Sequence, residues 1–115
     1  MKNLLSVFAF LIPMLFAFAN PQSPETTCPT PANVHVTGTS SGSISYDWDS
    51  CNCFSTGFSV NYQRLSDGYT SPEVFVTSSD YTFNGLQAGD YKFFFKTHCG
   101  SEVSATIFLE DRIMN

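Results

Sequence analysis

The chain is predicted to be an all-β protein, a seven-stranded antiparallel β-sandwich. After residue 28, short runs of alternating apolar and polar residues follow one another, and Gly, Ser, Asp and Asn separate them. No stretch in that part of the chain has the 3.6-residue period of an amphipathic helix. Many short strands with turn residues between them are typical of a sandwich or a barrel.

The first nineteen residues have the composition of a cleavable secretory signal. Lys2 supplies a positive charge, and Leu4 to Ala19 is almost wholly apolar. Ala17-Phe18-Ala19 then places small residues two positions apart, directly before polar chain. An uncleaved membrane anchor is the alternative, but a spanning helix needs about 20 apolar residues, and Pro13 interrupts this run. We therefore expect residues 1–19 to be removed and the protein to be secreted, either extracellular or periplasmic.

Signal cleavage leaves a short leader and one domain. Removing 19 of the 115 residues leaves 96, which is room for a single core. Residues 20–27, with the sequence Asn-Pro-Gln-Ser-Pro-Glu-Thr-Thr, bury nothing and are expected to be a flexible leader. Residues 28–111 are expected to form the domain.

The charge balance argues against a nucleic-acid partner. The chain after the signal holds ten acidic and four basic residues, a net charge of −6. A phosphate-binding surface needs clustered Lys and Arg, whereas these cations are scattered. For the same reason we expect no membrane binding after cleavage. The four cations are Arg64, Lys92, Lys96 and Arg112.

Seven runs carry the period-two alternation. The apolar members of each run share one face of a strand, and two sheets bury those faces against each other. The runs are Val34–Val36, Ile44–Trp48, Phe58–Tyr62, Val74–Val76, Tyr81–Phe83, Tyr91–Phe95 and Ser104–Leu109. The aromatic side chains expected to point inward are Tyr46, Trp48, Phe58, Tyr62, Tyr81, Phe83, Tyr91, Phe93 and Phe95.

Three stretches, in this order, resemble the fibronectin type III family. Ser45–Asp49 is similar to the second strand, whose core tryptophan corresponds to Trp48. Gly57–Tyr62 is similar to the third strand, with its glycine, aromatic, aliphatic and tyrosine residues. In Tyr81–Tyr91 a leucine, Leu86, is followed five residues later by a tyrosine. The resemblance implies an immunoglobulin-like sandwich in which the hydroxyl of Tyr91 bonds backbone at a tyrosine corner.

The cysteine-containing ends resemble a variant of that family found in secreted bacterial proteins. They are Cys28-Pro29-Thr30-Pro31 and Thr97-His98-Cys99-Gly100. The resemblance covers about residues 28–110. The segment from Asp49 to Cys53 departs from it, because most family members lack two cysteines there.

The four cysteines, Cys28, Cys51, Cys53 and Cys99, are even in number and follow the signal, which predicts a disulfide framework. The topology of the resemblance gathers them at one pole. A Cys51–Cys53 bridge would close a very small ring, so two pairings remain. They are Cys28–Cys51 with Cys53–Cys99, and Cys28–Cys53 with Cys51–Cys99. A metal site is disfavoured, because zinc fingers use wider spacing.

We expect no enzyme, metal or cofactor. The two histidines are His35, on an outer strand face, and His98, beside a cysteine, and neither is part of a nucleophile–base pattern. Asp47 and Asp49 both point outward, but Asp-x-Asp alone is a weak calcium signal. Solvated acids at a strand end are the favoured interpretation.

An exposed aromatic pair is the surface feature most suggestive of function. Because Phe93 and Phe95 point inward, Phe94 must face solvent, and a hairpin near Gly100 brings it opposite Phe108. Such a patch, beside Tyr69 or Phe75, suggests partner contact, although single exposed aromatics are common. The core markers of the fold are Trp48, Tyr62, Leu86 and Tyr91.

Two functional classes fit these features. The first is a secreted binding or adhesion module with a protein or cell-surface ligand. The second is a structural or assembly component of an exported or cell-surface complex. A monomer would favour the module and a discrete oligomer the assembly component.

Overall fold

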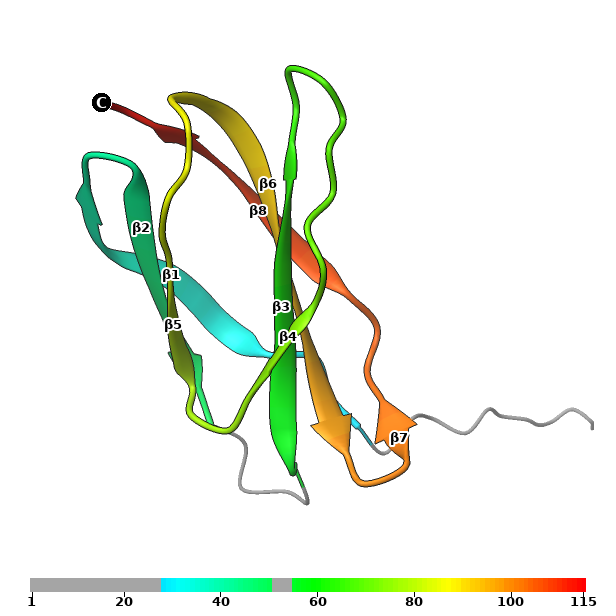
Figure 1. The fold of residues 1–115 in the computed structure, drawn as a ribbon. Coiled ribbons are helices and arrows are strands. Elements are labelled where there is room, and N and C mark those ends of the chain that lie inside the picture. Colours follow the sequence, from blue (N-terminus) through cyan, green and yellow to red (C-terminus); the bar gives the residue numbers. More distant parts are fainter. Residues whose placement is uncertain (1–27, 51–54) are drawn as a thin grey trace, which may run out of the picture.

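The computed structural model describes residues 28–50 and 55–115, which form two antiparallel sheets packed face to face (Figure 1). The predicted all-β sandwich is confirmed. The signal, the leader, Cys51 and Cys53 lie outside the described residues. The strands are β1 (Ala32–Ser40), β2 (Ser43–Asp49), β3 (Gly57–Arg64), β4 (Val74–Val76), β5 (Asp80–Phe83), β6 (Gly89–Cys99), β7 (Glu102–Val103) and β8 (Ile107–Ile113).

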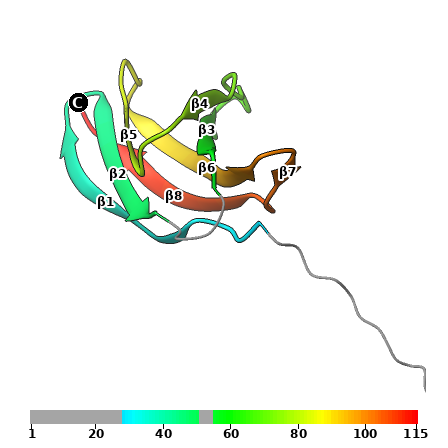
Figure 2. The same cartoon turned by 90° about the horizontal axis from the view of Figure 1, so that it is seen from below.

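One sheet has three strands in the order β1-β2-β5. The other has five, in the order β4-β3-β6, with β7 and β8 both paired to β6. Seen from below, the two sheets form two curved layers, with β5 and β4 at one side of the sandwich and β1 and β8 at the other (Figure 2). The edge strands are β1 and β5 in the first sheet and β4, β7 and β8 in the second.

The core lies between the layers and is mostly aromatic. Along β6, Tyr91, Phe93 and Phe95 are fully buried, while the residues between them are only partly buried. This alternation follows from the pleat of the strand, and all nine predicted inward aromatics lie in the core or pack against it. The buried cluster consists of Ile44, Tyr46, Trp48, Phe58, Val60, Phe83, Leu86, Tyr91, Phe93, Phe95 and Ile113.

The tyrosine corner predicted from the resemblance is present. The Tyr91 hydroxyl donates a hydrogen bond to the Gln87 carbonyl at 2.9 Å. Leu86 is buried beside it. The bond fixes the turn that leads from β5 into β6, and so it fixes which β6 residues face outward.

The predicted last strand was wrong in its bounds. It was expected over Ser104–Leu109, but Ser104 interrupts the pairing, because its hydroxyl accepts the Thr97 N–H at 2.9 Å and its own N–H reaches the Thr97 carbonyl. Pairing divides into β7 before this point and β8 after it. Strand β8 then continues to Ile113, which is buried, past the predicted domain end at residue 111.

Strand β1 follows its prediction only in part. Val34 packs against the core, whereas Val36 is exposed. Val36 is the cross-strand partner of the buried Tyr46 and so shares its face of the sheet, but β1 is an edge strand and leaves the Val36 side chain uncovered.

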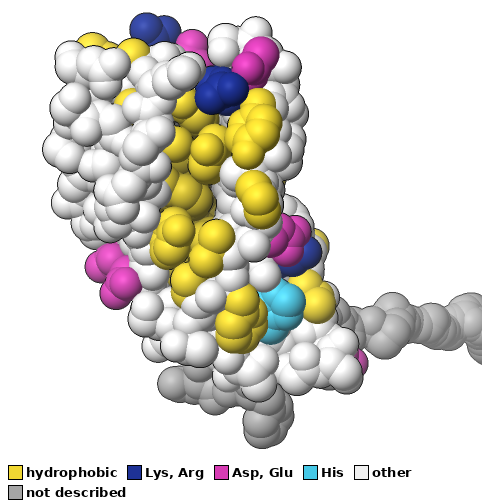
Figure 3. All heavy atoms as spheres, in the orientation of Figure 1, with side chains coloured by type: hydrophobic (Ala, Val, Ile, Leu, Met, Phe, Trp, Pro, Cys, Tyr) yellow, Lys and Arg dark blue, Asp and Glu magenta, His cyan; other side chains and the backbone are white. Residues whose placement is uncertain are grey.

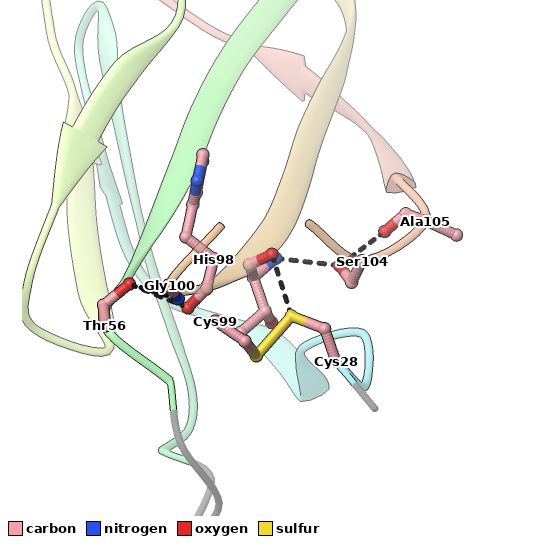
Figure 4. The surroundings of a disulfide bond; sticks show 8 residues. Cys28, Thr56, His98, Cys99, Gly100, Ser104 and Ala105 are labelled. Atoms are coloured by element: carbon pink, nitrogen blue, oxygen red, sulfur yellow. Dashed lines mark hydrogen bonds between the residues drawn. A yellow bond between two sulfur atoms is a disulfide. The ribbon is translucent and has the colours of Figure 1, made fainter. Parts of the chain in front are cut away.

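Both predicted cysteine pairings were wrong for the residues described. Cys28 is bonded to Cys99, with their Cα atoms 5.7 Å apart across 71 residues of sequence (Figure 4). The topology expected from the sequence placed four cysteines at one pole, but it gave no information on the distances between them. Here Cys28 lies against the end of β6, with its Sγ 3.3 Å from the Thr97 carbonyl, so it meets Cys99 directly. The bridge ties the start of the three-stranded sheet to the five-stranded one.

Candidate contact surface

The outer face of the five-stranded sheet carries an aromatic pair. Phe94 on β6 and Phe108 on β8 are direct cross-strand partners, with ring centroids 6.0 Å apart. Phe108 is 51% exposed. The Lys92 ammonium lies over the Phe108 ring, 4.7 Å from its centroid, an arrangement that holds the ring in place through a cation–π contact.

A third aromatic side chain, Phe75 on β4, lies on the same outer face. It is the cross-strand partner of Ser59 and is 54% exposed. Its ring stands edge-on to the His98 imidazole at 5.2 Å and covers Gly57, where a Cβ would overlap the ring. Glycine at position 57 is therefore needed for Phe75 to lie flat across β3.

His98 also contacts a serine. The Ser59 hydroxyl and His98 Nε2 are 2.5 Å apart. A nucleophilic serine needs access to substrate and a base that a third group orients, whereas Ser59 is buried beneath this face. The contact is best explained as a polar link between β3 and β6. Sequence reasoning missed it, because the two residues lie 39 positions apart.

The cations on this face differ in their partners. Lys96 pairs with Glu73 at 3.1 Å, and Arg112 pairs with Asp90 at 3.0 Å. Lys92 forms no ion pair among the described residues and contacts the Phe108 ring instead. A positive charge thus lies beside an exposed apolar ring, with Glu110 as the cross-strand neighbour of Lys92.

The outer face of the three-stranded sheet has a different composition. Ser45 and Thr82 join β2 to β5 through a hydroxyl–hydroxyl bond of 2.7 Å. Asp47 and Asp80 are direct cross-strand partners, and both are exposed. Like charges placed opposite one another weaken a sheet. The described part of this sheet carries no Lys or Arg.

A groove runs along the open side of the sandwich, between β5 and the β3–β4 pair. Figure 3 shows hydrophobic side chains along this recess. Tyr62 lies at its centre, with ring centroids 6.2 Å from Tyr69 and 6.1 Å from Phe83. Partial burial raises the pKa of Tyr62. The groove has a volume of about 250 Å³ and is lined by Val60, Asn61, Tyr62, Tyr69, Ser71, Pro72, Val74, Tyr81 and Phe83.

The turn after β3 holds one end of this groove. Arg64 donates two hydrogen bonds to the Asp67 carboxylate and lies over the Tyr69 ring at 5.2 Å. Its guanidinium holds the pKa of Asp67 below the ordinary value, and the Asp67 carboxylate raises that of Arg64. The Tyr69 N–H also donates to Asp67 at 3.0 Å. Tyr69 is therefore positioned at the groove and does not lie beside Phe94.

The structure thus brings some of the site residues predicted from sequence together and places others elsewhere. Phe94 and Phe108 meet, and Phe75 shares their face. His35 is exposed on β1, where its Nδ1 lies 2.6 Å from the Asn33 carbonyl oxygen. The groove was not predicted, because Tyr69 and Pro72 belong to an irregular segment without a periodic pattern.

Within residues 28–50 and 55–115, no group of three His, Cys, Asp or Glu side chains is placed to hold a metal ion. That portion of the chain also contains no helix long and apolar enough to cross a membrane.

Comparison with known proteins identifies the fold. No family model and no curated protein sequence matches the chain. Among solved structures, the fn3 domain of human collagen alpha-1(XX) chain superimposes with a TM-score of 0.68 at 18% identity, over 82% of this chain and 94% of that one. The twitchin kinase region from C. elegans gives 0.63 at 15% identity over 75% of this chain, which spans only 16% of that protein. A computationally redesigned β-sandwich protein gives 0.64 at 20% identity, over 73% and 88% of the two chains. The described residues have the fibronectin type III fold.

Proposed function

We propose that this protein is a secreted, non-catalytic binding module that contacts a protein or cell-surface partner through the outer face of its five-stranded sheet. The observation that carries the proposal is the Phe94–Phe108 pair, half exposed at Phe108 and flanked by Lys92, whose ammonium lies over the Phe108 ring. Interfaces are enriched in aromatic residues. Domains with this fold are generally binding or structural modules, which supports the same class.

The exposed area is large enough to matter for affinity. A phenylalanine presents about 200 Å², so a ring that is half exposed can bury about 100 Å² more. At about 25 cal/mol per Å², this corresponds to roughly 2.5 kcal/mol of hydrophobic transfer free energy, from which the costs of association are subtracted. This upper figure lies in the range of an interface hot spot.

The test is capture of a partner with two matched proteins, the wild type and Phe108→Ser. Culture supernatant and cell-surface extract are passed over each, and the affinity of every captured species is then measured with purified material. We expect at least tenfold weaker binding by Phe108→Ser, with a melting temperature within a few degrees of the wild type. Equal affinity of both proteins for all captured species would contradict this assignment.

The second candidate function is an assembly component of an exported or cell-surface complex. One observation favours it, the uncharged aromatic groove on the open side of the sandwich. The groove and the outer sheet face are separate surfaces. Variants of Phe108 therefore distinguish binding through the face from assembly through the groove.

A further inference from the structure

The groove between β5 and the β3–β4 pair suits an extended, uncharged ligand. None of the described residues that line it is charged, and four are aromatic. Tyr69 and Val74 are 46% and 40% exposed, so both present apolar surface to solvent. An exposed apolar surface of this kind on a folded domain is a candidate binding site.

The walls of the groove are already ordered. The Tyr62 N–H donates to the Ser71 hydroxyl at 2.9 Å, and the Asn61 amide donates to the Ser71 carbonyl at 3.3 Å. These bonds hold the Ser71–Pro72 wall against β3. A preformed site loses little conformational entropy when it binds an extended segment.

We propose that this groove binds residues 20–27 of a second copy of the chain. That segment, Asn-Pro-Gln-Ser-Pro-Glu-Thr-Thr, contains Pro21 and Pro24 three positions apart. A polyproline II segment has three residues per turn and rises about 3.1 Å per residue, so the two rings lie on one face about 9 Å apart. Aromatic-lined grooves bind proline-containing segments of this kind. The exposed Tyr69 ring and the partly buried Tyr62 ring, 6.2 Å apart, offer aromatic surface to such a segment, whereas Phe83 is buried.

Charge gives the direction of binding. Residues 20–24 carry no side-chain charge, as the groove lining does not, and Glu25 follows directly. Arg64 lies over Tyr69 at one end of the groove. With Pro24 against Tyr69, the Glu25 carboxylate would approach the Arg64 guanidinium, which it would share with Asp67.

The segment of the same molecule is too short to bind in this way. Cys28 is bonded to Cys99 and lies against Thr97, which is the cross-strand partner of Phe58. From Phe58 to Arg64, whose N–H bonds the Tyr69 carbonyl, β3 extends about 20 Å at roughly 3.3 Å per residue. Pro24 precedes Cys28 by four residues, which span at most about 14 Å. The occupant is therefore the segment of another copy.

This contact joins unlike surfaces, the leader of one copy and the groove of the next. Such heterologous contacts either close into a ring or continue as a chain. The outer face of the five-stranded sheet stays free in both cases. The inference is thus independent of the proposed partner contact at Phe108.

The first test measures self-association of the chain from Asn20 to Asn115 by sedimentation over a range of concentrations. We expect the average mass of the wild type to rise with concentration. The double variant Pro21→Ala/Pro24→Ala and the groove variant Tyr69→Ser should each associate at least tenfold more weakly, with melting temperatures close to that of the wild type. Phe108→Ser is the matched control and should associate as the wild type does. A wild type that stays monomeric throughout, or an oligomer that only Phe108→Ser dissociates, would overturn the proposal.

The second test uses a synthetic peptide with the sequence of residues 20–27. It is titrated into the Pro21→Ala/Pro24→Ala protein, and the tyrosine ring signals are followed by NMR. The proposal requires saturable shifts at Tyr62, Tyr69 and Tyr81, and none with a peptide in which both prolines are alanine. Shifts confined to residues outside the groove, or equal shifts with both peptides, would refute it. A monomeric wild type whose groove tyrosines shift on the double substitution would instead show binding of its own leader.

Discussion

The two outer sheet faces of this domain follow the same pleat but present different chemistry. The face built on β6 exposes Phe75 and Phe108 and leaves Phe94 partly exposed, and all four basic residues of the described chain lie in β3, β6 and β8. The opposite face exposes hydroxyls and the cross-strand pair Asp47 and Asp80. Alternation determines that a residue points outward, but only its chemistry shows whether that face is solvated or suited to contact.

The largest expected loss of unfolding free energy comes from a substitution on the buried side of β6, and the outward side of the same strand provides the comparison. Phe93 is fully buried between four other aromatic rings. Phe93→Ser empties an aromatic core position and buries a hydroxyl, so it should cost about 3–5 kcal/mol of unfolding free energy. Phe94→Ser should cost no more than about 1 kcal/mol, as for ordinary surface sites. Urea denaturation measures both, and equal losses would show that the β6 register is wrong by one residue.

The bond between Cys28 and Cys99 is expected to rank next, because it joins the two sheets covalently. It closes a loop over 71 residues of sequence, and removing a native disulfide from a small domain costs about 2–5 kcal/mol. The variant Cys28→Ala/Cys99→Ala should lose stability in that range. Non-reducing peptide mapping of the wild type should recover the two cysteines in one cross-linked peptide. A map that links either of them to residue 51 or 53 would contradict the structure.

A hydrogen bond between the sheets gives the third effect. The Tyr46 hydroxyl on β2 donates to the Asp111 carboxylate on β8 at 2.5 Å. Tyr46→Phe should cost about 1.5–3 kcal/mol, as for a bond to a charged acceptor. The control is Tyr81→Phe, whose hydroxyl has no hydrogen-bond partner in the described residues, and which should cost less.

The same bond predicts a pH dependence. Burial, followed by the hydrogen bond to Asp111, raises the pKa of Tyr46 above its ordinary value of about 10. The folded state therefore keeps a proton that the unfolded chain releases. This stabilisation is fully present below about pH 10 and is lost as pH rises above that value. Wild-type unfolding free energy should fall more steeply than that of Tyr46→Phe above pH 10, and parallel curves would count against the coupling.

The smallest effect concerns the acidic face. Because Asp47 and Asp80 oppose each other across β2 and β5, Asp80→Lys should replace a repulsive pair with an attractive one. We expect a gain of about 0.2–1 kcal/mol in unfolding free energy. Adding salt should reduce that gain by screening. A loss of stability in Asp80→Lys would show that the carboxylate has a favourable role on this face.

Sequence patterns predicted some features of this molecule and missed others, and each outcome has a physical reason. The alternation of Phe93, Phe94 and Phe95 predicts two buried rings and one outward ring, because the pleat has a fixed period. The partner of Cys28 depends on distances between chain segments far apart in sequence, and no local pattern reports them. Ser104 divides the last strand through a side-chain bond to Thr97 that alternation does not reveal.

The groove is the feature that the sequence predicted least well. Tyr62 was predicted to face the core, and it does pack there, yet its ring also forms part of a surface recess. That recess exists because β4 and β5 are short edge strands and leave one side of the sandwich uncovered. Tyr69 reaches it through the turn that Arg64 and Asp67 hold, which no period-two pattern describes.

The contrast between the two outer faces is tested most directly by NMR mapping of the bound state with the captured partner. Side-chain and amide signals of both sheets are recorded with and without that partner. We predict saturable changes at Lys92, Phe94 and Phe108, and none at Ser45 or Thr82 on the opposite face. Changes confined to Ser45, Thr82 and their neighbours, with Phe94 and Phe108 unaffected, would contradict the assignment of the five-stranded sheet as the contact surface.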